Sequence, residues 1–260
     1  MPIRDKCLNL IKANPHLSSQ YFETVCCAGI GEDGKWRRQY PVSFRVLEDA
    51  QKFKRWSWIE YEYIEPRNDK RKESQKVQDN SIRVVGTAKT SERATCLNHL
   101  IFPNFSIPEK REDSLTLIRP TKSNFHWKRR DPDDVALQTR KHADIVRQGS
   151  FLHKEAAPLA QCPYSFHFSW HDNNGKKWNS TCDDWETSAT FFNRRRALGN
   201  EQAALDSMSE TFNKDYPEKG MALAFSTHSL RNWQWLLVGV LRADKTNQAS
   251  LSLDSQSPLQ

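Results

Sequence analysis

Residues 21–40 read YFETVCCAGIGEDGKWRRQY, an apolar segment and a polar segment separated by a glycine-rich one. The apolar segment, residues 21–30, predicts a strand, and residues 35–40 predict its antiparallel partner. Between them, Asp33 and Gly34 form a dipeptide that is typical of tight hairpin turns. The stretch therefore predicts a β-hairpin in the N-terminal half of the chain.

The residues that follow the hairpin extend the β-rich pattern. Residues 44–53 predict a short, partly helical connection, and residues 56–64 predict a third strand with two distinct faces. Three strands within one short stretch indicate a small barrel or a strongly bent sheet. Residues 66–81 carry one aliphatic side chain besides a proline, so we expect an exposed loop or linker there.

The C-terminal half mixes strand and helix signals. Asp131 and Pro132 are a typical helix start, because Asp caps the free N–H groups and Pro suits the first helical position. Gly199 is a typical residue after a helix end, and Asn200 is a typical cap. The predicted helices are residues 131–147, one ending near Gly199 and one starting after Asn200, and the predicted strands are residues 164–170, 221–227 and 233–241.

The fold class that follows is α+β. We expect a basic, β-rich, small barrel-like module over residues 1–120 and an α+β module over residues 121–242, packed together. Residues 243–260 are rich in Ser, Gln and Asn and predict a disordered tail.

Composition narrows the class of protein. Aromatic residues make up 11% of the 260-residue chain, which argues against global disorder. There is no apolar run of membrane-spanning length and no apolar signal segment, so we expect a cytoplasmic protein without a membrane partner. The six cysteines form no C-x-x-C pair, so we predict reduced thiols and no zinc site.

Charge is distributed unevenly along the chain. The net charge is +7, and residues 1–150 alone hold 28 Lys and Arg against 20 Asp and Glu. A polyanion is the natural partner of such a surface, because Lys and Arg that neutralise phosphates release counterions. The alternative is a solvated basic surface that keeps the protein soluble.

Two basic segments are the candidate nucleic-acid-binding sites. Guanidinium groups can clamp phosphates, and exposed aromatic rings can stack on bases. In the alternative interpretation the Trp residues belong to the core and the cations solvate its rim. The first segment comprises Trp36, Arg37, Arg38, Arg45, Lys52, Lys54, Arg55 and Trp56, and the second comprises Lys128, Arg129 and Arg130 beside Trp127.

Asp184, Glu186 and His228 are weak candidate catalytic residues for a different function, a metal-dependent nuclease or hydrolase. Clustered carboxylates and imidazoles can bind Mg²⁺ or Mn²⁺ that activates water. The competing interpretation is helix capping by Asp184, with His228 as a loop residue. We expect no cofactor unless the nuclease interpretation holds.

Several short stretches resemble, in their order, a family of uncharacterised bacterial accessory-genome proteins. The resemblance covers roughly residues 20–242 and implies one coherent unit with a role in defence or in mobile elements. It implies no established activity. The stretches are ETVCCAGI (23–30), DGKWRRQYP (33–41), FKRWSWIE (53–60), SLTLIRP (114–120), PYSFHF (163–168), DWE (184–186), TH (227–228) and WLLVG (235–239).

The leading prediction is a nucleic-acid-binding accessory protein of a bacterial defence or mobile-element system that docks phosphates on its basic N-terminal surface. One alternative is the metal-dependent nuclease or hydrolase. The other is a protein-interaction subunit in a multi-subunit system, whose basic face meets an acidic partner. The sequence favours a binding protein over an enzyme and leaves open DNA or RNA, and single or double strands.

Overall fold

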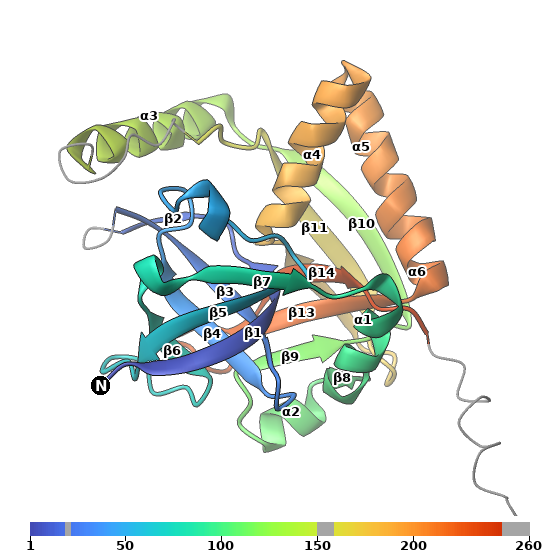
Figure 1. The fold of residues 1–260 in the computed structure, drawn as a ribbon. Helices are drawn as coiled ribbons and strands as arrows, with labels where there is room; N and C mark the ends of the chain where they lie inside the picture. The colour runs from blue at the N-terminus through green and yellow to red at the C-terminus, as the bar shows by residue number, and fades with distance from the viewer. Residues whose placement is uncertain (19–21, 150–158, 246–260) are drawn as a thin grey trace, which may run out of the picture.

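The computed structural model describes residues 1–18, 22–149 and 159–245. It confirms the α+β class: a closed five-stranded barrel near the N-terminus lies beside an α+β region that carries the long helices (Figure 1). None of the helices within the described ranges is long and apolar enough to cross a membrane.

The barrel closes because its first strand pairs with strands on both sides. β1 pairs with β3 along one edge and with β5 along the other, and β4 and β6 complete the ring. Short strands β2 and β7 add to β3 and β5. The bounds are β1 Ile3–Lys12, β2 His16–Ser18, β3 Phe22–Gly31, β4 Trp36–Val42, β5 Ser57–Ile64, β6 Ser74–Val77 and β7 Arg83–Thr87.

The predicted hairpin is confirmed as β3 and β4. Ile30 faces Trp36 across the turn, and Gly34 has a φ of 73°, a left-handed conformation that glycine adopts without a Cβ penalty. The alternation of β4 sends Gln39 to the Tyr61 hydroxyl inside the barrel and Arg38 to the C-terminal region. Residue 21 of the predicted strand lies outside the described ranges.

Residues 66–81, which we expected to be an exposed loop or linker, contain strand β6 and a short 3-10 turn, Asp79–Ser81. Val77 and the polar Gln75 of β6 are buried. The Gln75 side chain accepts a hydrogen bond from Tyr61 and donates one to Asp5. The strand lacks apolar alternation because polar side chains satisfy each other inside the barrel.

The C-terminal region contains two sheets and most of the helices. One sheet is antiparallel, and the other is antiparallel except for the parallel pair β8 and β9. The sheet order is β14-β13-β9-β8 in one and β10-β11-β12 in the other. The strands are β8 Ile101–Phe102, β9 Leu115–Ile118, β10 Lys122–Arg129, β11 Tyr164–His171, β12 Lys177–Thr181, β13 Met221–Thr227 and β14 Trp235–Arg242; the helices are α1 Thr90–Leu97, α2 Ser106–Lys110, α3 Pro132–Gly149, α4 Trp185–Leu198, α5 Glu201–Glu210 and α6 Tyr216–Lys219.

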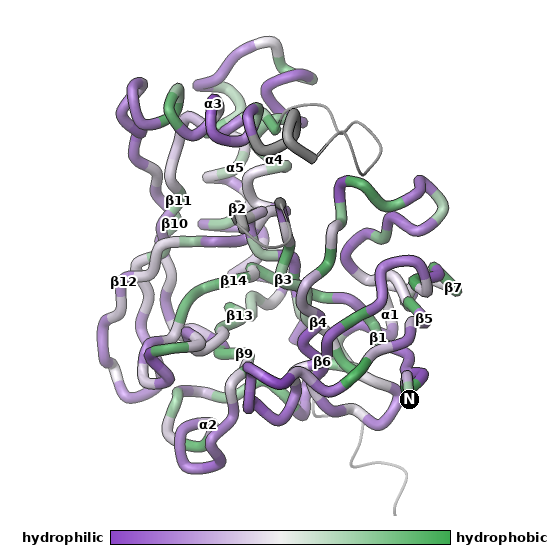
Figure 2. The backbone as a smooth tube through the Cα atoms, turned by 90° about the vertical axis from the view of Figure 1, so that its left-hand side faces the viewer, coloured by the Kyte–Doolittle hydropathy of each residue, from purple (hydrophilic) through white to green (hydrophobic). Residues whose placement is uncertain are grey.

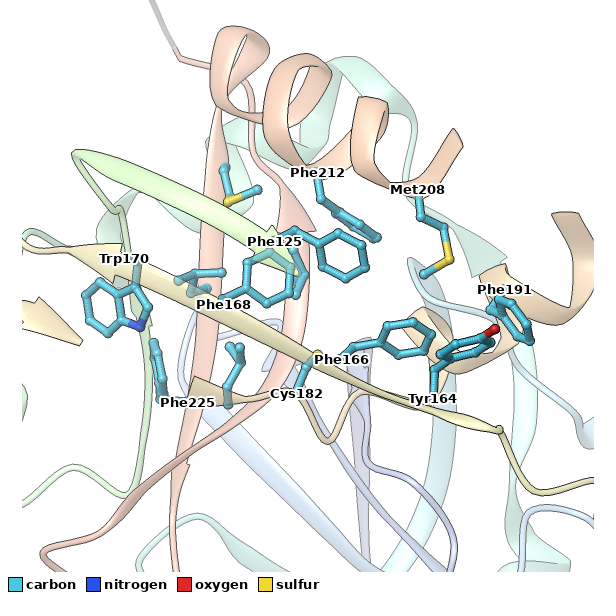
Figure 3. Close-up of a cluster of buried hydrophobic side chains, with 14 of the residues drawn as sticks. Phe125, Tyr164, Phe166, Phe168, Trp170, Cys182, Phe191, Met208, Phe212 and Phe225 are labelled. Atoms are coloured by element: carbon cyan, nitrogen blue, oxygen red, sulfur yellow. The ribbon is translucent and has the colours of Figure 1, made fainter. Parts of the chain in front are cut away.

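Aromatic side chains fill the core of the C-terminal region. Phe166, Phe168 and Trp170 alternate along the inner face of β11 and are all buried. Phe125 from β10 and Phe212, which follows α5, pack against Phe168, and the centroids of the Phe125 and Phe212 rings are 5.0 Å apart (Figure 3). One face of the β10–β11–β12 sheet is therefore fully used by the core, and the opposite face points away from it.

A second core joins the barrel to the four-stranded sheet. Leu8 and Ile11 of β1 and Trp36 of β4 cluster with buried side chains of β9, β13 and β14. A Cβ added at Gly239 of β14 would lie only 3.3 Å from the Ile11 Cγ1 atom, so the two layers approach closely there. Figure 2 shows the resulting order, with the β10–β11–β12 sheet at one side, β13 and β14 in the middle and the barrel at the other side.

Near our predicted boundary after residue 120, two strands belong to the four-stranded sheet of the C-terminal region. β8 and β9, which lie before that residue, pair with each other and β9 pairs with β13. At the other end of the chain, Ala243 and Lys245 still donate backbone hydrogen bonds to Gly220 and Lys219. The predicted tail from residue 246 onward lies outside the described ranges.

Candidate functional site

The two Trp residues of the predicted N-terminal site belong to the core. Trp36 is 8% exposed and Trp56 is 7% exposed, and both contribute to the cluster that joins the barrel to the C-terminal sheet. Arg38 is 1% exposed. The core interpretation therefore applies to the two Trp residues, whereas the burial of Arg38 matches neither interpretation.

Most of the remaining N-terminal cations are engaged in ion pairs. These charges are offset locally, while the Lys54 side chain is exposed to solvent. Because a paired cation must leave its carboxylate to meet a phosphate, the N-terminal segment is a weak phosphate surface. The pairs are Arg37 with Asp5 at 2.6 Å and Asp33 at 3.1 Å, Arg45 with Glu23 at 2.7 Å, Lys52 with Asp49 at 2.8 Å, and Arg55 with Asp184 at 2.8 Å.

Asp184 caps helix α4, as the competing interpretation of this residue held. Its carboxylate accepts a hydrogen bond from the Glu186 backbone N–H at 3.2 Å and is 99% covered by protein. Glu186 pairs with the Lys12 ammonium at 2.7 Å. Burial alone would raise the pKa of Glu186, but Lys12 and Arg55 hold it below its usual value. Both carboxylates therefore form structural ion pairs, Asp184 with Arg55 and Glu186 with Lys12.

The third catalytic candidate, His228, follows β13 at the mouth of a cleft between the barrel and the C-terminal sheet. Its Nδ1 atom accepts a hydrogen bond from the Leu230 backbone N–H at 3.1 Å. Within the described parts of the chain, no three His, Cys, Asp or Glu side chains gather closely enough to hold a metal ion.

The second predicted segment forms strand β10, where the sequence analysis had assigned no element. Lys128 projects from the outer face of the sheet, and Arg129 is exposed beside Tyr164 and Glu201. Arg130 donates to the Cys162 carbonyl oxygen at 3.1 Å and to Gln138 at 2.7 Å. Of the residues predicted to bind nucleic acid in this segment, Lys128 therefore lies on the outer face of the sheet, and Arg129 is exposed on the opposite face.

The outer face of the β10–β11–β12 sheet combines polar and basic side chains. The registers of the two strand pairs place eleven residues on this face, and none of them is acidic. All eleven are exposed or half-buried. They are Lys122, Asn124, His126 and Lys128 from β10, Ser165, His167, Ser169 and His171 from β11, and Lys177, Asn179 and Thr181 from β12.

Two imidazole rings stack at the centre of this outer face. The His126 and His167 ring centroids are 5.4 Å apart with an interplanar angle of 19°. Burial lowers the pKa of His167, and the neighbouring His126 and Lys128 lower it further. Ser165 lies within hydrogen-bond distance of His167 Nε2 at 3.0 Å, so the ring has a fixed orientation.

An amide side chain from the helical layer fixes the edge strand of this sheet. Asn213 lies in a π-helical turn, Thr211–Asp215, between α5 and α6. Its side chain accepts a hydrogen bond from the Phe125 N–H at 2.6 Å and donates one to the Phe125 carbonyl at 3.1 Å. The backbone of β10 is thereby held on the side where no further strand pairs with it.

Sequence reasoning missed this face for an identifiable reason. Residues 164–171 alternate aromatic and polar side chains, YSFHFSWH, and that signal alone identifies an outward row of Ser and His. The corresponding rows from β10 and β12 have few apolar residues, and nothing in those segments distinguishes a strand from a loop. Only the pairing of the three strands brings the eleven residues together.

The protein is thus an α+β protein in which a closed barrel shares a hydrophobic core with a C-terminal region. The C-terminal region exposes the basic outer face of the β10–β11–β12 sheet. The chain belongs to the family described as domain of unknown function DUF8757, whose model matches residues 106–256. A second model, domain of unknown function DUF8758, matches residues 3–101. The first matched range ends in β8 and the second begins with α2. No curated protein matches the chain.

Proposed function

We propose that the protein binds single-stranded nucleic acid through the outer face of the β10–β11–β12 sheet. The observation that carries this proposal is the composition of that face, in which three adjacent strands present three Lys and three His residues without one carboxylate. Anionic phosphates meet only attraction on such a surface. The proposal thus keeps a nucleic-acid partner and moves the docking surface from the barrel to the C-terminal region.

The lysines of the face are available for phosphates. Lys122, Lys128 and Lys177 are exposed, and no ion pair joins them to a carboxylate among the described residues. Each phosphate that a lysine neutralises releases part of the condensed counterion layer, which favours binding at low salt. Arg129, the next residue after Lys128, points to the opposite face of the sheet, beside Tyr164 and Glu201, and is not part of this surface.

The remaining side chains suit unpaired bases. Imidazole rings can stack on bases, and Ser, Asn and Thr side chains can donate to or accept from base edges. β11 has eight residues, so the face extends about 26 Å along the strands at roughly 3.3 Å per residue. A flat sheet of this kind reaches the bases of a single strand more readily than those buried in a duplex.

The test is binding of fluorescent single-stranded RNA and DNA of about 20 nucleotides, measured by anisotropy at low salt. The triple variant Lys122→Glu, Lys128→Glu, Lys177→Glu should bind at least about 100-fold more weakly, because three attractive charges become repulsive. A matched control is Lys35→Glu, Lys54→Glu, Lys110→Glu, which changes the net charge equally at exposed lysines elsewhere. Equal losses in both variants would overturn the assignment to this face.

We further propose, from the resemblance of its sequence, that the protein serves a bacterial defence or mobile-element system in the cytoplasm, alone or with protein partners. This role requires binding to nucleic acid in the cell. Cross-linking and sequencing of bound strands during phage infection tests it: enrichment of phage or element transcripts or DNA is expected. Recovery of no nucleic acid above that of the triple Lys→Glu variant would contradict it.

A further inference from the structure

Beside the core that joins the barrel to the C-terminal sheet, residues of both parts line a large cleft. Its volume is about 960 Å³, which is at the upper end of the roughly 300–1,000 Å³ typical of small-molecule sites. β1, β3 and β4 contribute one wall and β13 and β14 the other, with the segment after β5 at the mouth. None of the eleven residues on the outer face of the β10–β11–β12 sheet lines this cleft.

Arg38 is the most deeply buried cation of the cleft. Its guanidinium donates to Ser226 Oγ at 2.8 Å and to Ser114 Oγ at 2.7 Å, which fixes its orientation. Its Nε atom is buried and has no hydrogen-bond partner, and no described carboxylate forms an ion pair with it. The buried Glu73 carboxylate accepts a hydrogen bond from the same Ser114 Oγ at 2.8 Å and offsets part of this charge, while the spare Nε donor favours an anion in the cleft.

Two further arginines, Arg67 and Arg71, line the cleft. Arg71 donates to the Thr227 carbonyl at 2.8 Å and to both oxygens of Asp69, so its charge is partly offset. Burial alone would raise the pKa of the Asp69 carboxyl group, but hydrogen bonds from Arg71 and Ser74 lower this pKa to about 2. Arg67 is exposed at the mouth. In all, four cationic side chains and three carboxylates line the cleft.

The rest of the lining is largely apolar. Ile11, Leu115 and Val238 form an aliphatic wall, and the half-exposed Tyr40 ring lies at the edge of the cleft. An anion-binding end beside an apolar wall and the accessible Tyr40 ring fits an anionic ligand that carries a flat ring.

We propose that this cleft binds a nucleotide, with its phosphate at Arg38, Arg71 and Arg67 and its base against the aliphatic wall and Tyr40. The nucleotide is either free or the 5′-terminal unit of a strand; both sources present the same phosphate and base. Arginine suits the phosphate because its planar guanidinium matches the phosphate oxygens. The hydroxyls of Ser226 and Thr227 lie at the same end.

The cleft contains its own reporter, the half-exposed thiol of Cys26. Alkylation of Cys26 by iodoacetamide, followed by peptide mass spectrometry, should slow when a nucleotide fills the cleft. Cys96 is also half-exposed and lies outside the cleft, so it serves as the internal control. At a concentration about ten times Kd, protection should be about tenfold, because only the unliganded fraction reacts.

The probes are 5′-AMP, 5′-UMP, adenosine, inorganic phosphate and a 5′-phosphorylated oligonucleotide. Selective protection of Cys26 by 5′-AMP or 5′-UMP, stronger than by adenosine or phosphate, supports the proposal. Protection by the oligonucleotide but not by free nucleotides identifies the strand terminus as the source. No protection by any of these probes, or equal protection by inorganic phosphate alone, overturns the nucleotide assignment.

Two variants separate the cleft from its surroundings. Arg67→Gln changes an exposed side chain and should reduce protection several-fold in a folded protein. Arg38→Lys keeps the charge but removes the planar donor group, and should abolish protection. In the triple Lys→Glu variant of the sheet face, 5′-AMP should protect Cys26 from iodoacetamide as well as it does in the wild type. Failure of one proposal is therefore distinguishable from failure of the other.

Discussion

The Arg55 guanidinium donates to both oxygens of the Asp184 carboxylate, at 2.8 and 2.9 Å, and so joins the residues before β5 to the first turn of α4. Asp184 is 1% exposed. We expect Arg55→Met to lower the free energy of unfolding by about 3 kcal/mol, because it leaves a buried carboxylate without its partner. Urea unfolding followed by circular dichroism measures this.

Lys52→Met is the matched control for that prediction. The Lys52 ion pair with Asp49 lies on the surface, where Asp49 is almost fully exposed. An exposed pair of this kind contributes about 0.5 kcal/mol or less. Equal losses for Arg55→Met and Lys52→Met would show that the buried pair has no special weight.

Gly29 is required by the close pairing of β3 with β1. A Cβ added there would lie 2.0 Å from the Leu8 carbonyl oxygen, a contact that only backbone movement can relieve. We expect Gly29→Ala to destabilise the barrel by at least about 2 kcal/mol. Gly86 on β7 is the control, because a Cβ there meets no atom within 4 Å. Thermal unfolding of Gly29→Ala at the wild-type temperature would contradict the close contact.

The imidazoles of the sheet face make binding depend on pH. An imidazolium adds a positive charge beside the phosphates, so binding of single strands at low salt should strengthen as the pH falls through the range in which imidazole takes up a proton. His167 should contribute only near the acidic end, since burial, His126 and Lys128 lower its pKa. Replacing His126, His167 and His171 by Gln should flatten the pH profile. An unchanged profile would remove the histidines from the interface.

Asn213 should control the order of β10 without touching the outer face. Asn213→Ala removes both hydrogen bonds to the Phe125 backbone. We expect a loss of about 1–2 kcal/mol in stability, and faster hydrogen exchange along β10 than along β13. Uniform acceleration of exchange across both strands would point to global destabilisation instead.

The predictable parts of the fold are those in which local sequence and burial agree. The hairpin at Gly34, the Asp184 and Asn200 caps and strand β13 all have side-chain patterns that match their environment. β6 and β10 were not predicted. Gln75 of β6 forms hydrogen bonds with the distant Tyr61 and Asp5, and the backbone of β10 is held by the distant Asn213. Such partners leave no local periodicity for a sequence pattern to reveal.

The site divides in the same way. The excess of positive charge could be predicted from the sequence. Which cations are exposed and without an ion pair, and so able to bind phosphates, could not. Arg37, Arg45 and Arg55 find carboxylates that are distant in sequence, and burial removes Arg38 from the surface. Lys128 was identified as a candidate, whereas its neighbours Lys122 and Lys177 join it only through strand pairing.

The salt dependence of single-strand binding tests the central claim most directly. The logarithm of the association constant should fall with the logarithm of salt concentration, and the slope should lose about 2 units when Lys122, Lys128 and Lys177 are changed to Gln together, at about 0.7 per phosphate contact. The same change at Lys35, Lys54 and Lys110 should leave the slope as it is. A slope unaffected by the sheet-face lysines, or reduced equally by the control set, would contradict phosphate docking on the β10–β11–β12 sheet.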